Sequence, residues 1–94
     1  MRRDAEFFGE TDLDLLYMAR TLRAALRLED ILAAAGVDYL IETGTYTAGW
    51  LMRRELTGAF FYVLPADLSR ARQILIENRY KPYSINDEAA PAER

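Results

Sequence analysis

The chain has 94 residues, enough for one domain that buries about 60% of its unfolded surface. Hydrophobic residues make up 51% of it and charged residues 29%, as in a folded globular protein. It has no Cys and no His, which excludes disulfides, thiol nucleophiles, imidazole catalysis and Cys/His zinc sites. With a net charge of −3 and no basic tract, we expect no nucleic-acid partner.

Membrane and export signals are also missing from the sequence pattern. No apolar run approaches the roughly 20 residues that span a bilayer, and the first residues lack the apolar stretch of a signal peptide. We therefore expect a cytoplasmic protein with no membrane partner.

The two ends differ in composition from the middle of the chain. Residues 1–12 are acidic and are expected to form an arm, in which Phe7 and Phe8 pack onto the domain or onto another subunit. Residues 86–94 are rich in Ala, Pro and acidic residues, which predicts a disordered tail. Residues 13–85 then form the single domain.

A strand and a helix are predicted first. Leu13–Ala19 is a short apolar run bounded by polar residues, as expected of a buried strand. Thr21 stands at the N-cap position of a helix that runs to Ala35, and Gly36 is placed to end it in a left-handed conformation. The apolar residues of this helix share one stripe: Ala24, Ala25, Leu28, Ile31, Leu32 and Ala35.

Two further strands follow, separated by a long connection. Residues 37–43 alternate between two faces, which indicates a strand. We expect residues 44–58 to form an irregular connection, with one or two helical turns within 50–56. Residues 59–64 are continuously apolar and aromatic, as in a central strand, and Pro65 ends it.

The last elements are a second helix and a doubtful strand. The helix begins near Ala66 and Asp67, and Leu68, Ala71 and Leu75 share its apolar face. Residues 80–85 form a possible short last strand, where a proline suits an edge position.

The order β-α-β-β-α predicts an α+β fold, a ferredoxin-like α/β sandwich. In this fold both helices cover one face of a mainly antiparallel sheet. Phe60 and Tyr62 fall on one face of the third strand and Phe61 on the other. The uncovered face would expose aromatic area, so we expect a homo-oligomer, a dimer or larger, formed through the sheet or its edge.

Three stretches carry a family resemblance: Leu16–Ala19, Leu32–Val37 and Val63–Arg72. Through them the region Leu15–Tyr83 resembles a small bacterial family of prokaryotic signal-transducing proteins. The resemblance implies a fold similar to that of nitrogen-regulatory PII-type proteins, with ligand sensing and oligomerisation and with no catalytic residues. PII-type proteins carry a functional loop between the second and third strands, and residues 44–58 occupy that topological place.

The connection 44–58 is the candidate contact site because long loops often carry function. Its hydroxyls, its indole and its two guanidinium groups can bind an anionic ligand or a partner protein. The candidate binding residues are therefore Thr45, Tyr46, Thr47, Trp50, Arg53 and Arg54. Gly44 and Gly49 have the Gly-x-x-x-x-Gly spacing of a P-loop, but the Lys-Ser/Thr that completes a P-loop does not follow them. The alternative is that residues 50–52 plug the open sheet face or a subunit contact.

Other charged residues give weaker signals. Arg20, Arg23 and Arg27 lie on neighbouring turns and form either an anion-binding strip, with Asp30 placed to pair with Arg27, or a solvated face. No carboxylates are spaced for acid–base catalysis, so we expect no catalytic residue and no cofactor. The acidic arm lacks the EF-hand pattern, so we expect no metal site, with an oxygen-ligand site in the arm as the alternative. Three functions stay open: a self-associating regulatory module that uses 44–58 as its contact surface, a sensor of a small anionic ligand with a pocket beneath that loop, and an enzyme using carboxylates or Tyr.

Overall fold

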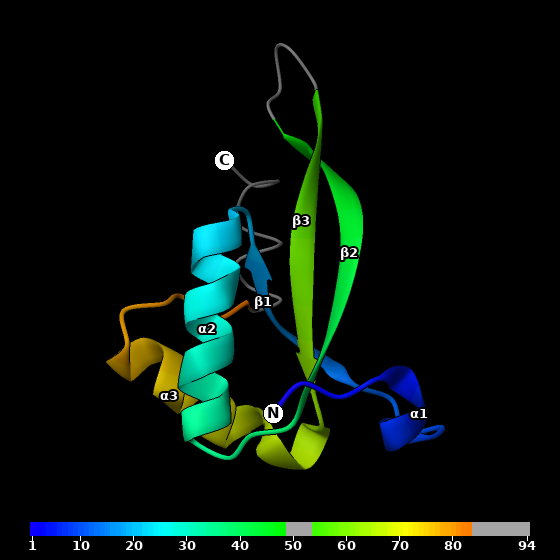
Figure 1. The fold of residues 1–94 in the computed structure, drawn as a ribbon, viewed down its shortest axis with the longest axis vertical. Helices are drawn as coiled ribbons and strands as arrows, with labels where there is room; N and C mark the ends of the chain where they lie inside the picture. Colours follow the sequence, from blue (N-terminus) through cyan, green and yellow to red (C-terminus); the bar gives the residue numbers. More distant parts are fainter. Residues whose placement is uncertain (49–53, 84–94) are drawn as a thin grey trace, which may run out of the picture.

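The structure is a computed structural model that describes residues 1–48 and 54–83, with the backbone alone for 46–48 and 54–56. Its three strands form an antiparallel sheet in the order β1-β3-β2 (Figure 1). The elements in chain order are α1 (Ala5–Phe8), β1 (Asp14–Ala19), α2 (Leu22–Ala34), β2 (Tyr39–Ala48), β3 (Arg54–Val63), a 3-10 turn (Pro65–Asp67) and α3 (Leu68–Glu77). The protein is thus a mixed α+β fold, as predicted.

Helices α2 and α3 cover the same face of the sheet. Leu28 of α2 and Leu75 of α3 are both fully buried in one cluster with Leu16, Phe61 and Val63 of the strands. Because a single cluster joins both helices to the sheet, the prediction of two helices on one face is confirmed.

Helix α2 begins and ends where its capping residues require. The side-chain oxygen of Thr21 accepts a hydrogen bond from the amide of Ala24 at 3.1 Å. At the other end Gly36 has φ +72°, a conformation that favours glycine, and the next amide, of Val37, donates to the carbonyl of Leu32 at 3.0 Å. These local contacts explain why the helix could be predicted nearly to the residue.

The prediction of an irregular connection over 44–58 is wrong. β2 continues to Ala48 and β3 starts at Arg54, with Gly44 directly opposite Gly58. A Cβ atom on Gly44 would lie 3.1 Å from the ring of Phe60, so this glycine makes room for an aromatic ring within the sheet. The threonines of this stretch are β-branched and favour an extended backbone.

The prediction of one or two helical turns within 50–56 is also wrong for residues 54–56, the part of this segment that the structure describes. Residues 54–56 belong to β3. Residues 50–53 lie outside the described residues.

The N-terminal residues pack onto the domain, one of the two alternatives predicted for them. The carbonyl and the amide of Tyr39 bond to the amide of Arg3 at 2.8 Å and to the carbonyl of Met1 at 3.1 Å. Phe8 is buried outside the main cluster, and Phe7 stays half exposed. Figure 1 shows the strands between α1 and the pair α2 and α3.

The segment after α3 packs back across α2 and β1. The hydroxyl of Tyr80 donates to the carbonyl of Ala24 at 3.0 Å, and its ring meets Tyr17 edge-on at 5.0 Å. The amide of Tyr83 donates to the carbonyl of Leu16 at 2.8 Å. Residues 80–83 are not a strand, and the rest of the predicted last strand and tail lies outside the described residues.

Asp67 precedes α3 without capping it through its side chain. It makes no side-chain capping bond, and its carboxylate lies 3.6 Å from the guanidinium of Arg70. The 3-10 turn that starts at Pro65 brings the chain into the helix without such a cap.

Candidate functional site

The predicted contact residues lie on a two-stranded ribbon. β1 pairs only with residues 59–63 of β3, so the part of β2 from Gly44 onward extends past β1 together with β3 (Figure 1). Thr45, Tyr46 and Thr47 belong to β2, Arg54 belongs to β3, and Trp50 and Arg53 lie outside the described residues. Of the six, the side chain of Thr45 alone is described, and it is exposed.

A small cavity lies at the base of this ribbon. It has a volume of about 170 Å³ and lies between the start of α2 and residues 43 and 57–59 of the strands. Small-molecule sites usually measure about 300 to 1,000 Å³. The volume of this cavity is below that range, and the side chains of residues 46–56 lie outside the described part of the structure, so the pocket beneath 44–58 stays a prediction.

The outer edge of β2 carries backbone groups that have no partner among the described residues. The amide and carbonyl of Tyr39 bond to residues 1 and 3 and therefore point away from β3. Alternation along a strand directs the same groups of Ile41, Thr43 and Thr45 outward as well. Within residues 1–48 and 54–83 none of these groups has a bonding partner.

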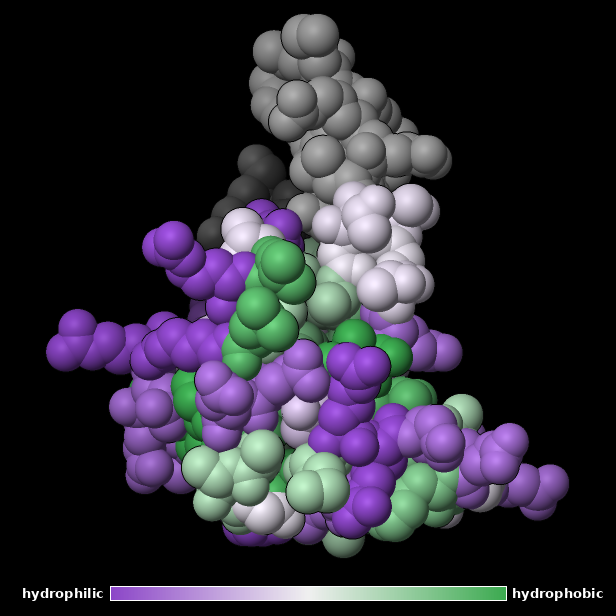
Figure 2. Space-filling view, in the orientation of Figure 1, coloured by the Kyte–Doolittle hydropathy of each residue, from purple (hydrophilic) through white to green (hydrophobic). Residues whose placement is uncertain are grey.

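Two exposed leucines lie above this edge. Leu22 is 75% exposed and Leu26 52% exposed, and they share a stripe of α2 with Glu29. That stripe faces β2, because Glu29 accepts a hydrogen bond from the hydroxyl of Tyr39 at 2.9 Å. Figure 2 shows hydrophobic surface over the upper part of α2, beside the pale surface of the ribbon.

The hydroxyl of Tyr39 is held in its neutral form. Burial and the hydrogen bond to Glu29 raise the pKa of Tyr39 far above its usual value near 10. Arg2 lies 3.7 Å from the same Glu29 carboxylate. These contacts fix α2 over the start of β2.

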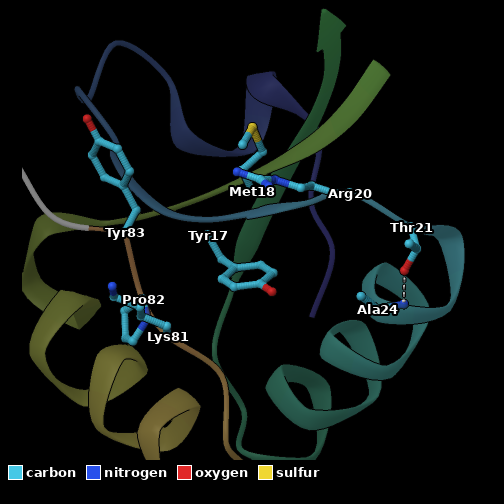
Figure 3. A pocket seen from close by; sticks show the side chains of 8 residues that line it. All are labelled: Tyr17, Met18, Arg20, Thr21, Ala24, Lys81, Pro82 and Tyr83. Carbon is cyan, nitrogen blue, oxygen red and sulfur yellow. Dashed lines mark hydrogen bonds between the residues drawn. The ribbon is translucent and has the colours of Figure 1, made fainter. Parts of the chain in front are cut away.

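A larger cavity lies at the opposite edge of the sheet, beside β1 (Figure 3). Its volume is about 460 Å³, and the end of β1, the start of α2 and the segment after α3 form its walls. The lining residues are Tyr17, Met18, Arg20, Thr21, Ala24, Lys81, Pro82 and Tyr83. Two of them are cationic, and none of the described lining residues is acidic.

Tyr17 forms one wall of this cavity. Burial and the neighbouring Tyr80 raise the pKa of Tyr17, while the positive charge of Arg20 opposes that rise. At neutral pH Tyr17 therefore carries a hydroxyl that can donate a hydrogen bond.

Arg20, Arg23 and Arg27 are all exposed, as in the predicted alternative of a solvated face, and their contacts differ. Arg20 precedes α2 and lines the cavity, whereas the guanidinium of Arg27 lies 5.1 Å from the ring centre of Tyr80 and donates to the carbonyl of Asn78. Arg27 thus helps hold the segment after α3 against α2. Arg23 is exposed on the helix surface.

Carboxylates are not gathered into a catalytic or metal-binding group in the part of the chain that the structure describes. No three of them lie close enough to hold a metal ion. Asp38 is 3.0 Å from the guanidinium of Arg3, and Glu42 is exposed.

No family model, curated protein or solved structure matches this chain. Among residues 1–48 and 54–83, no helix has both the length and the apolar character to cross a bilayer. The function is therefore argued from the geometry of the site.

Proposed function

We propose that this protein is a non-enzymatic interaction module that self-associates through the outer edge of β2. The unpaired backbone groups of Ile41, Thr43 and Thr45 beside exposed leucines carry this proposal. An open sheet edge is a template for pairing with another strand. The N-terminal residues cover it only at Tyr39.

The edge has the chemistry of a strand that pairs. Residues 41–45 contain β-branched residues, no proline and a single charge, that of Glu42. Protective features of free edges, such as lysine or proline, do not occur at these positions. The edge strand therefore favours association.

The edge is complementary to a second copy of itself. An antiparallel pairing centred on Thr43 places Ile41 opposite Thr45 of the other copy and Glu42 opposite Gly44. The two Glu42 carboxylates then do not face each other. Such a pairing has two-fold symmetry, so it closes as a dimer and doubles the three-stranded sheet.

The leucines strengthen the same contact. When two β2 edges pair, the two α2 helices lie side by side over the joined sheet, and the stripe with Leu22 and Leu26 faces its counterpart. Backbone bonding fixes the register, and burial of the leucines supplies apolar free energy.

The fold family and the role are part of the same proposal. The order of the elements, with both helices on one face, supports a ferredoxin-like sandwich reduced to three strands. The resemblance of residues 15–83 to prokaryotic signal-transducing proteins supports a cytoplasmic regulatory role. Gly44 and Thr45 of the proposed interface fall within the predicted contact stretch 44–58.

Thr43→Pro tests the proposal because the amide of Thr43 points away from β3. Proline there removes a donor from the interface and none from the β2–β3 ladder. We expect sedimentation equilibrium to give a dimer for the wild type at micromolar concentration and a folded monomer for Thr43→Pro. Thr43→Val, which keeps the amide, should remain a dimer.

A monomeric mass for the wild type at micromolar concentration would overturn the proposal. A dimer that persists in Thr43→Pro would place the contact elsewhere on the molecule. Circular dichroism of the proline variant checks that the sheet is retained.

A further inference from the structure

Arg79 stands at a position that usually belongs to glycine. It follows α3 with φ +67°, and within the described part of the chain it is the single residue other than glycine with a positive φ. The amide of Tyr80 donates to the carbonyl of Leu75 at 2.9 Å, and the amide of Arg79 donates to the carbonyl of Ile76 at 3.1 Å. These two bonds are those of a helix end that favours glycine. A side chain in this conformation lowers the stability of the fold, and such residues gather where proteins bind their ligands and partners.

Two contacts place Arg79 beside the first half of α2. The guanidinium of Arg27 donates to the carbonyl of Asn78, the residue before Arg79. The hydroxyl of Tyr80, the residue after it, donates to the carbonyl of Ala24. Figure 1 shows this segment crossing α2 on its way to β1.

The same half of α2 carries two exposed arginines. Arg23 and Arg27 are four residues apart, so their charges repel each other along the helix. Asp30, which the spacing predicts as a partner of Arg27, is exposed and forms no ion pair with any described residue. The guanidinium of Arg27 turns instead to the segment after α3 and stacks on the ring of Tyr80.

Arg23, Arg27 and Arg79 thus form a cationic patch on the outer side of the helices. The side chains of Arg23 and Arg79 are exposed and make no hydrogen bond or ion pair within residues 1–48 and 54–83. Arg27 adds its charge, although its donors are already in use. Since Arg23 and Arg79 lower stability and give the fold no such contact in return, they are residues expected of a binding surface.

The patch fits an acidic segment of another protein. Membrane-binding surfaces take about four to eight clustered cations, and nucleic acids also need a larger number, so three arginines are too few for either. The rise between Arg23 and Arg27 along the helix is about 6 Å. Alternate residues of an extended chain are about 6.8 Å apart, so their carboxylates can reach both arginines.

We infer that the cationic patch binds an extended acidic segment of a partner protein. The guanidinium groups of Arg23 and Arg79 bond to its carboxylates, and Arg27 adds positive charge beside them. Arg27 reaches the segment after α3, whereas the stripe with Leu22 and Leu26 faces β2. The patch therefore goes beyond the proposed self-association and does not depend on it.

Two peptides of equal length, hexaglutamate and hexaglutamine, test the inference. We expect hexaglutamate to shift the backbone amide NMR signals of Arg23, Arg27 and Arg79, with saturation in the millimolar range or below. Hexaglutamine should bind about tenfold more weakly, because it cannot make charge-assisted hydrogen bonds. Raising the ionic strength from about 0.01 M to about 0.1 M should weaken the binding of hexaglutamate, since salt screens exposed charges.

Variants separate the patch from general attraction between charges. Arg23→Gln and Arg79→Gln should each weaken hexaglutamate binding severalfold. Arg70→Gln is the matched control and should leave it unchanged, because Arg70 is exposed but lies 3.6 Å from Asp67 and donates to the carbonyl of Ala35 at the other end of α2. Arg79→Gly should weaken binding and also raise the urea midpoint of unfolding, because glycine adopts a positive φ without strain.

Four results would overturn the inference: no shifts at the three arginine amides, equal affinity for the two peptides, an affinity that Arg23→Gln and Arg79→Gln leave unchanged, or an Arg79→Gly variant less stable than the wild type. The last result would show that the fold itself needs the side chain of Arg79. Binding to phosphatidylserine vesicles without any binding of hexaglutamate would assign the patch to a membrane and overturn it too. Each of these results leaves the proposed self-association standing.

Discussion

The double substitution Leu22→Ala and Leu26→Ala tests the contribution of α2 to the dimer. Burying a leucine side chain contributes about 2 kcal/mol relative to full exposure. Since Leu22 is 75% exposed and Leu26 52% exposed, their burial contributes about 2.5 kcal/mol per protomer, or about 5 kcal/mol per dimer. Alanine retains part of this area, so we expect a loss of about 3 kcal/mol, a Kd about 100-fold higher.

The assay is sedimentation equilibrium over a concentration series, with thermal unfolding recorded in parallel. Because both leucines are exposed and alanine favours a helix at least as well as leucine, the fold of the monomer should not suffer. Ile76→Ala is the matched control, since Ile76 is 56% exposed on α3, away from the proposed interface. A Kd that the double variant leaves unchanged, or that Ile76→Ala raises equally, would refute the reasoning.

Two further predictions concern the stability of the fold. Tyr39 has a raised pKa in the folded state, so above pH about 10 the unfolded chain loses this proton and the folded chain keeps it. The free energy of unfolding should therefore fall by about 1.4 kcal/mol per pH unit because of this residue. Urea titrations at several pH values should show that the free energy of unfolding of Tyr39→Phe falls less steeply with pH. An equally steep fall in the variant and the wild type would contradict this. Thr21→Ala removes the side-chain cap of α2 and should lower the free energy of unfolding, measured with urea, by about 1 kcal/mol. Thr21→Ser keeps the capping oxygen and should change it little. An alanine variant as stable as the wild type would show that the cap does not stabilise the helix.

Local signals made much of the fold predictable. The cap at Thr21, the left-handed Gly36 and the proline at 65 mark element ends through contacts with near neighbours in the chain. The apolar stripe predicted for α2 likewise placed Leu28 on the buried side of the helix by periodicity alone.

The stretch 44–58 was mispredicted because its glycines were interpreted as breaks in regular structure. Gly44 pairs with Gly58 across the ribbon, and Phe60 packs against Gly44, which are relations between two strands. A sequence pattern along one strand does not contain them. The threonines at 43, 45 and 57 were the signal that favoured extended structure.

Both candidate sites depend on tertiary placement. Leu22 and Leu26 lie next to the predicted buried stripe, but their position over the open edge of β2 depends on how α2 lies on the sheet. Tyr17 and Lys81 line the same cavity because Tyr80, the neighbour of Lys81 in the chain, packs against the ring of Tyr17. Self-association through the sheet or its edge was predicted from the sequence and stays a prediction.

The most direct measurement of the pairing is an isotope-filtered NOE experiment on a sample that mixes labelled and unlabelled protein. Antiparallel pairing of β2 edges centred on Thr43 predicts intermolecular contacts between Ile41 and Thr45, together with protection of the Thr43 amide from hydrogen exchange. Rapid exchange of the Thr43 amide and no intermolecular contact from residues 41–45 would contradict it.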